Sequence, residues 1–307
     1  MPTFESGATR FLETVFLKLA YLLIEAPFEY LRRLGLHDRQ KPYEVFIPLE
    51  NFSNPAIPRT NLQLEARTAL VQDARGREHE FTLDEHGFAC CTHETRGLDL
   101  QALDLQAIES EYLPEVQALI RRCISGVQRM CSFDWGVRKS MDRGEFAKKT
   151  VDLENGLDPL LPAVHPHVVQ RRMGDEAAEL LKGRFRIINV WRPPHIVKSW
   201  PLALRDAQTV KPDDLVPADI IRKRFVGETC FAAHSTDHRW YFLSHQREDE
   251  VVMSKIYDSD PNVQANCTNQ YFGNLAACLH SSFRACLDED EQTRESIEVR
   301  TLVFTDA

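Results

Sequence analysis

The chain has 307 residues, of which 43% are hydrophobic and 27% are charged, as in an ordinary folded globular protein. These proportions exclude disordered, collagen-like and membrane-spanning classes. Asp and Glu number 46 against 37 Lys and Arg, and the formal charge of -9 supplies no basic surface for phosphates, which excludes nucleic acid as a partner.

The amino-terminal stretch is the most apolar part of the chain. Its apolar side chains recur near helical spacing at Phe11, Val15, Leu19, Leu22 and Leu23. This pattern predicts an amphipathic helix over residues 8–26 that Pro27 ends. Glu13, Lys18 and Glu25 interrupt the apolar run, and it lacks the pattern of a secretory leader. We expect the helix to pack on the domain or on a partner in a homodimer; the alternative is that it lies on a membrane surface.

The eight cysteines show no metal or redox spacing, because no two of them form a CxxC pair. Scattered cysteines in a chain of this length are typically reduced, small apolar core residues. They predict no disulfide framework, and together with the missing leader they predict a cytoplasmic location.

Strand patterns surround a helical segment in the first half of the chain. Residues 42–90 read as short strands and turns, and residues 104–132 show helical spacing of apolar side chains. Phe133 to Trp135 return to a strand pattern. Residues 140–166 are rich in charged residues, Gly and Pro, and their apolar residues show neither helix nor strand periodicity. This composition predicts a long irregular connection.

The second half of the chain is predicted to be mainly strands. A short helix over residues 171–182 is expected to end at Gly183 in a left-handed cap, and RFRIINVW at 184–191 is typical of a core strand. Further strand patterns are CFAAHS, RWYFLS, EVVMSKIYD and ESIEVRTLVF. The sequence therefore predicts a mainly β fold with flanking helices.

Histidines are the remaining candidates for catalysis, because the chain contains no GxGxxG, P-loop, GxSxG or HExxH motif. His165 and His167 end the irregular segment, and His280 lies in the β-rich half. A nonhaem iron site needs two imidazoles and one carboxylate, and an Arg such as Arg294 or Arg300 suits a co-substrate carboxylate. For any single His, a surface or hydrogen-bonded core role is the alternative.

Several sequence blocks together resemble one family. They are KPYEV at 41–45, PRTNLQLE at 58–65, FTLDEHGF at 81–88, YLPEV at 112–116, INVWRP at 188–193, PLALRDAQTV at 201–210, DEVVMSKIYDSD at 249–260 and RESIEVRTLVF at 294–304. In order along the chain, they resemble the fungal hydroxylase/desaturase family of AsaB-like enzymes, gibberellin desaturase and CmcJ-like proteins. The resemblance implies a double-stranded β-helix (jelly-roll) core over residues 41–307, with residues 1–40 as a helical extension.

The same resemblance implies an Fe(II)- and 2-oxoglutarate-dependent oxidoreductase that hydroxylates or desaturates a small apolar natural product of fungal secondary metabolism. It assigns His167 and His280 as iron ligands and catalytic residues. Arg294 or Arg300 is then expected to bind 2-oxoglutarate, and Arg192 with Trp191 to line the pocket. For Trp191 and Arg192 the alternative is a structural Trp and an Arg paired with an acid such as Asp206.

The chain departs from the family pattern at the expected metal site. Family members carry a His-x-Asp segment, where this chain reads His167, Val168 and Val169, and CTNQYFGNLAACL at 267–279 looks like an insertion before His280. Two alternatives follow: a metal-free cyclase, isomerase or dehydratase, and a noncatalytic partner of another enzyme. If residue 169 faces the metal, Val169→Asp is expected to tighten iron binding.

Overall fold

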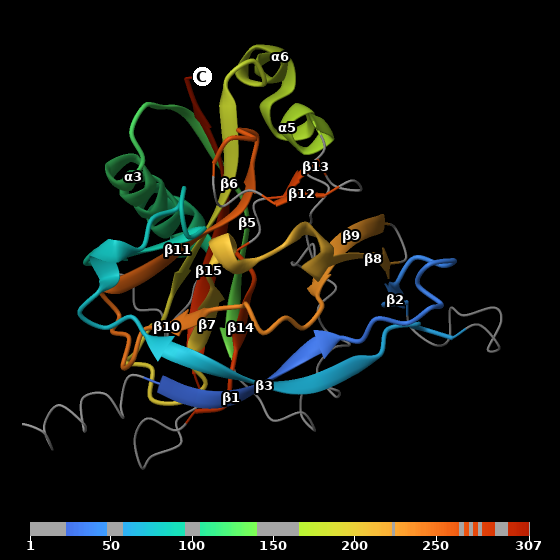
Figure 1. The fold of residues 1–307 in the computed structure, drawn as a ribbon. Coiled ribbons are helices and arrows are strands. Elements are labelled where there is room, and N and C mark those ends of the chain that lie inside the picture. Colours follow the sequence, from blue (N-terminus) through green and yellow to red (C-terminus); the bar gives the residue numbers. More distant parts are fainter. Residues whose placement is uncertain are drawn as a thin grey trace, which may run out of the picture.

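Two five-stranded sheets packed face to face form the body of the protein (Figure 1). The computed structural model describes residues 23–47, 58–95, 105–139, 166–222, 225–263, 267–269, 273–275, 278–285 and 294–306. No helix in these ranges combines the length and apolar character needed to cross a membrane.

The strands are β1 (Leu23–Leu31), β2 (Tyr43–Val45), β3 (Leu64–Asp73), β4 (Phe88–Thr92), β5 (Val127–Lys139), β6 (Arg184–Arg192), β7 (Leu202–Arg205), β8 (Leu215–Arg222), β9 (Phe225–Ala232), β10 (Trp240–Phe242), β11 (Glu250–Asp258), β12 (Cys267–Asn269), β13 (Gly273–Leu275), β14 (His280–Ser282) and β15 (Glu295–Thr305). The helices are α2 (Leu105–Ala107), a π-helix (Ile108–Tyr112), α3 (Leu113–Cys123), α5 (Pro166–Met173), α6 (Ala177–Leu180), and 3-10 turns at Glu78–Glu80, Gly174–Glu176, Ala207–Thr209 and Pro212–Asp214.

Most strands that are neighbours in a sheet are not consecutive in the sequence. The first sheet runs β1-β3-β10-β7-β14, the second β4-β11-β6-β15-β5, and a smaller sheet runs β2-β8-β9. All neighbours in the second sheet are antiparallel. The mainly β class is confirmed, and the curled sheets are consistent with the expected jelly-roll core.

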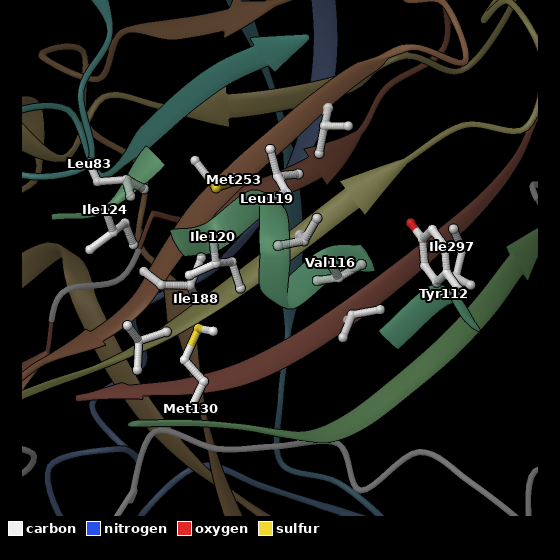
Figure 2. Close-up of a cluster of buried hydrophobic side chains, with 14 of the residues drawn as sticks. Leu83, Tyr112, Val116, Leu119, Ile120, Ile124, Met130, Ile188, Met253 and Ile297 are labelled. Carbon is white, nitrogen blue, oxygen red and sulfur yellow. The ribbon is translucent and has the colours of Figure 1, made fainter. Parts of the chain in front are cut away.

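The outer face of the second sheet is covered by α3 (Figure 2). Val116, Leu119 and Ile120 share one side of that helix and pack on Ile188 of β6 and Met253 of β11, among other buried residues. Each such side chain contributes about 1.5–3 kcal/mol on burial. Because successive strand residues point to opposite faces, the neighbours of these apolar residues point into the space between the two sheets.

The helix predicted over residues 104–132 is too long. Helix α3 ends at Cys123, and β5 begins at Val127. Gly126 separates the two with a left-handed φ of 69°, a conformation that glycine adopts without steric cost and that reverses the chain. The predicted strand around Phe133 is confirmed as part of β5.

The amino-terminal prediction also requires correction, because residues 23–26 belong to strand β1 and not to a helix. Ala26, Phe28 and Tyr30 point inward with the period of two that defines a strand. Pro27 is accommodated because β1 is the edge strand of its sheet. Residues 8–22 lie outside the described part, and the boundary at residue 40 stays a prediction.

The segment before β6 is helical, as expected, but it begins earlier. Helix α5 starts at Pro166, the last residue of the predicted irregular segment 140–166. Residues 140–165 lie outside the described residues. Gly183 does not have the left-handed φ of the predicted cap. A Cβ on Gly183 would lie only 2.6 Å from the Thr305 carbonyl oxygen, so close backbone approach is the reason for this glycine.

Candidate functional site

The polar interior between the sheets is built mainly on β15. Ile297 and Val299 point to the α3 side, so Ser296, Glu298 and Arg300 point the other way, into the interior. On the opposite sheet His280 of β14 pairs with Leu204 of β7, which places both side chains on one face of their sheet. Leu204 belongs to the apolar cluster between the sheets, and His280 therefore faces the same space.

His280 presents its Nε2 atom to this interior. Its Nδ1 lies 3.0 Å from the Cys278 carbonyl oxygen. A carbonyl only accepts, so Nδ1 carries the proton and the lone pair of neutral His280 is on Nε2. Burial lowers the pKa of His280, which favours this neutral form, although the side chain keeps substantial solvent-accessible area.

Two ion pairs join β15 to β5 on the interior face. Arg138 Nε donates a hydrogen bond to Glu298 Oε1 at 2.6 Å. Arg300 Nη1 donates a hydrogen bond to Asp134 Oδ2 at 2.8 Å. Burial alone would raise the pKa of Glu298, but the Arg138 guanidinium outweighs it and the pKa is lowered. His280 and Glu298 also interact electrostatically. The interior thus holds an ionised carboxylate beside a neutral imidazole.

Arg294 and Ser296 provide donors suited to a carboxylate. The Arg294 guanidinium lies 5.5 Å from the ring centroid of Trp191, a cation–π contact that fixes its position. Burial lowers the pKa of Arg294 to about 10. Ser296 is two residues further on and 1% exposed, and its Oγ makes no hydrogen bond to any described residue. A buried hydroxyl in this state beside a buried guanidinium fits a bound anion.

Arg192 is not brought to this interior. It follows Val190 on the α3 side of β6, where its guanidinium donates to the carbonyl oxygens of Glu248 (2.6 Å) and His93 (2.8 Å). Its Nη1 is also 3.5 Å from Oε1 of Glu115. Arg192 therefore binds helix α3 and two loops to the sheet, a structural role with a different acid from the expected Asp206. Trp191, on the opposite face, does line the interior.

The third position of the expected metal segment is occupied by a core residue. Val169 is 0% exposed and packs with Met173, Phe185 and Leu302 in the cluster under α5. Val169 supplies no carboxylate, and it is buried among apolar side chains on the same face of the second sheet as Glu298 and Arg300. That residue 169 faces a metal stays a prediction. The side chain of His167, on the same helix, lies outside what is described. Among the described residues no group of three His, Cys, Asp or Glu side chains could hold a metal.

An apolar wall completes the interior. Trp191, Val252, Leu202, Leu204 and Tyr241 are buried together between the two sheets. Such a surface binds apolar groups and excludes water from nearby polar groups.

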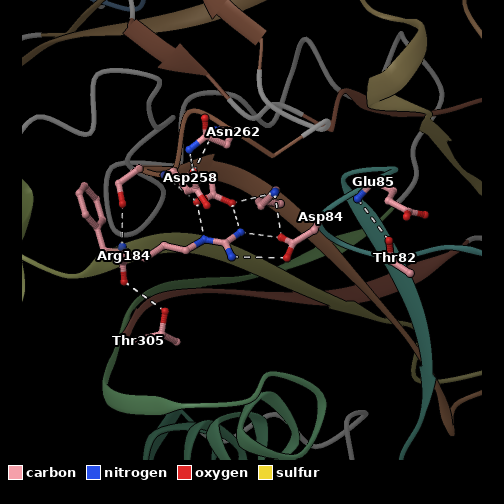
Figure 3. Close-up of polar contacts among 11 residues, drawn as sticks. Thr82, Asp84, Glu85, Arg184, Asp258, Asn262 and Thr305 are labelled. Atoms are coloured by element: carbon pink, nitrogen blue, oxygen red, sulfur yellow. Dashed lines mark hydrogen bonds and ion pairs between the residues drawn. The ribbon is translucent and has the colours of Figure 1, made fainter. Parts of the chain in front are cut away.

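An ion cluster of Asp84, Arg184, Lys255 and Asp258 is hydrogen-bonded to the backbone that leads into His280. Figure 3 shows the contacts of Arg184 with Asp84 and Asp258. Lys255 and Asp258 form an ion pair, with Nζ 2.8 Å from Oδ2 and both side chains fully buried. The Lys255 carbonyl accepts a hydrogen bond from the Cys278 amide at 3.0 Å, and the Cys278 carbonyl accepts from His280. The cluster is thus connected to the imidazole through one residue.

The sequence reasoning missed Ser296, Glu298 and Arg138. Ser296 and Glu298 had a usable signal, because they follow Arg294 at intervals of two in a predicted strand and so share its face. Arg138 had none, because only the pairing of Gly136 with Glu298 brings β5 alongside β15.

Comparisons with known proteins identify the family and the fold that this chain resembles. Residues 28–304 match a family described as an oxidoreductase/YMDC permease-like domain. The Fe(II)/2-oxoglutarate-dependent dioxygenase nvfI of Aspergillus novofumigatus (strain IBT 16806) is 30% identical over 261 residues, 81% of this chain and 87% of the relative. The hydroxylase/desaturase efuI of Hormonema carpetanum is 28% identical over 279 residues, 83% and 90% of the two chains. The solved structure of the iron and alpha-ketoglutarate-dependent endoperoxidase NvfI in a different conformation superposes with a TM-score of 0.73 at 27% identity, covering 93% of this chain and 99% of that one.

Proposed function

The chain belongs to the fungal family of Fe(II)/2-oxoglutarate-dependent hydroxylases and desaturases, and from this premise we propose that it is an oxidoreductase of secondary metabolism acting on a small, largely apolar natural product. One observation carries the proposal. The Nε2 side of His280 and the carboxylate-binding pair of Arg294 and Ser296 face the same polar interior, next to an apolar wall. The polar groups suit a charged co-substrate, and the apolar wall beside them suits an apolar substrate.

2-Oxoglutarate fits the donors that the chain provides. Arg294 and the Ser296 hydroxyl would bind one of its carboxylates, and Trp191 holds the guanidinium in place for that contact. Arg300 is the other candidate, but its Nη1 is bonded to Asp134. We assign the carboxylate to Arg294 because it lies two residues before Ser296 and therefore on the same side as the Ser296 hydroxyl, and we give Arg300 the role of holding β5 against β15.

Iron fits the chain in part. His280 would bind it through Nε2, with the Cys278 carbonyl holding the ring in the required tautomer. His167 is the second proposed ligand. Val169 supplies no carboxylate, so binding should be weaker than at a site with all three ligands. When bound, Fe(II) and 2-oxoglutarate supply the oxidation of C–H bonds by dioxygen.

Other residues of the interior bind the substrate, exclude water and set the electrostatic environment of His280. The wall formed by Trp191, Leu204 and Val252 binds the apolar substrate and excludes water. The pair of Glu298 and Arg138 sets the electrostatic environment of His280, because the carboxylate favours positive charge nearby.

Anaerobic titration of the full-length protein tests the proposal. Fe(II) and 2-oxoglutarate should together produce the weak metal-to-ligand absorption band, and exposure to air should release succinate. His280→Ala should abolish the band. Ser296→Ala should raise the 2-oxoglutarate concentration at half saturation by roughly 10-fold, as expected for one lost bond to a charged group. His79→Ala, on an exposed turn, is the control. Saturable binding that none of the site variants changes would disprove the residue assignment.

A metal-free member of the family is the second candidate function. Two observations favour it: Val169, which has no carboxylate, is buried in an apolar cluster, and the interior carboxylate Glu298 is already neutralised by Arg138. The protein would then act on its substrate as a cyclase, isomerase or dehydratase by acid and base catalysis. Absence of both the absorption band and succinate, with substrate turnover unchanged by a chelator, would support this candidate over the first.

A further inference from the structure

Two cysteines that are 32 residues apart in the sequence meet on the outer face of the second sheet. The Sγ atoms of Cys91 and Cys123 are 3.3 Å apart. No described cysteine is in a disulfide, and Cys91 is half-buried whereas Cys123 is exposed. The sequence predicted only isolated core thiols, so this pair arises from the tertiary structure.

The packing of α3 explains why the two thiols meet. Val116, Leu119 and Ile120 face the sheet, and Cys123 follows three residues after Ile120 on the same side of the helix. Cys91 points from β4 toward the same cluster. The neighbouring Cys90 points the opposite way, into the cluster between the sheets. Strand alternation thus selects one cysteine of the consecutive pair.

Arg122 holds the two elements together and places a positive charge beside the thiols. Its Nη2 donates to the carbonyl oxygen of Thr92, the residue after Cys91, at 2.8 Å. The hydrogen bond between the two thiols and the charge of Arg122 outweigh burial and lower the pKa of Cys123 to about 7. Burial raises the pKa of Cys90 to about 12. An exposed thiol with this environment reacts as a thiolate, whereas Cys90 does not.

We propose that Cys91 and Cys123 are a redox-active dithiol that a hydroperoxide converts into an intramolecular disulfide joining β4 to α3. The Cys123 thiolate attacks one oxygen of hydrogen peroxide, which forms a sulfenic acid and releases water after protonation. The Cys91 sulfur then attacks the Cys123 sulfur and displaces a second water. Two thiols and one peroxide give one disulfide and two waters. A thiol reductant then returns the disulfide to two thiols and is itself oxidised to a disulfide.

The dithiol lies apart from the polar interior, since α3 and the interior occupy opposite faces of the same sheet. The proposal is therefore independent of the assigned catalytic function. The bond would close a loop between residues 91 and 123, and such a crosslink should raise the melting temperature by roughly 5 °C.

Peroxide titration of the full-length protein followed by alkylation tests the proposal. After digestion without reductant, mass spectrometry should find a crosslinked peptide that contains Cys91 and Cys123, and dithiothreitol should remove it. Before oxidation, Cys123 should react with iodoacetamide at pH 7 at least about fivefold faster than Cys131. Cys131, on β5, has no other cysteine beside it among the described residues and serves as the matched control.

Cysteine variants distinguish a disulfide between Cys91 and Cys123 from disulfides that involve other cysteines or a second molecule. Cys123→Ser should abolish the crosslink and the rise in melting temperature, whereas Cys90→Ser and Cys131→Ser should leave both unchanged. A crosslink to Cys90, disulfide-linked dimers in place of the internal bond, or peroxide oxidation confined to other cysteines would overturn the proposal.

Discussion

Removing the charge of Asp258 should destabilise the protein far more than removing that of its neighbour Asp84. Asp258 is fully buried and accepts hydrogen bonds from three groups: Arg184 through Nε (2.9 Å) and Nη2 (2.6 Å), Lys255 through Nζ (2.8 Å), and the Asp260 amide (3.1 Å). Lys255 is also fully buried. Asp258 is the only fully buried carboxylate that these two described cations contact, since Asp84, which both also contact, is about half exposed.

Asp258→Asn preserves the shape of the side chain but turns an amide NH₂ group toward these donors. It leaves the Lys255 ammonium in the core with only the more distant Asp84, whose Oδ1 is 3.3 Å away. Loss of one partner of a buried ion pair costs about 3–5 kcal/mol. Asp84→Asn removes a partly exposed partner and should cost about 1 kcal/mol or less.

Urea unfolding followed by circular dichroism measures the difference directly. Asp258→Asn should lower the midpoint strongly and Asp84→Asn only slightly, while Lys255→Met in the Asp258→Asn background should recover part of the loss. Because the cluster is tied to Cys278 and through it to His280, iron binding by Asp258→Asn should also weaken. Equal and small effects of both single variants would refute the reasoning.

Three further predictions follow from other buried groups. Burial, and next to it the Arg205 guanidinium, lower the pKa of His238 to about 4. The unfolded chain therefore binds this proton at a higher pH than the folded one, and about 3 kcal/mol of stability should be lost as the pH falls from 6.5 to 4; His238→Gln should flatten that part of the measured stability profile. Val169→Asp should place a charge in the cluster under α5 and destabilise the protein by about 3 kcal/mol or more, as read from thermal melts. Gly183→Ala should lower the melting temperature, because its Cβ would meet the Thr305 carbonyl oxygen at 2.6 Å, whereas Gly35→Ala, which has open space around it, is the control; equal melting temperatures would contradict the close-approach argument.

Local patterns in the sequence predicted the elements that depend on neighbours in the chain. The β-branched run at 184–191 is strand β6, and the apolar spacing from Ile108 to Ile120 is the helical layer. The errors fall where a distant partner decides. Residues 23–31 became a strand because β3 pairs with them along their whole length, despite an apolar spacing that also suits a helix. The helix over 104–132 was cut short at Gly126 by the start of a strand that pairs with β15.

The sequence by itself determined the fold class, the family and most of the residue types available for chemistry, because periodicity and ordered blocks are properties of the chain. It named His280 and Arg294, but it did not show which side chains share a space. Strand register decided that: one-residue alternation sent Trp191 and Glu298 into the interior and Arg192 to the α3 side, and the turn of α5 put Val169 in the core. The same strand alternation points Cys91 to the α3 side and Cys90 to the interior side of the second sheet. Register and packing depend on partners far away in sequence, and for this reason only the tertiary structure revealed the composition of the site and of the dithiol.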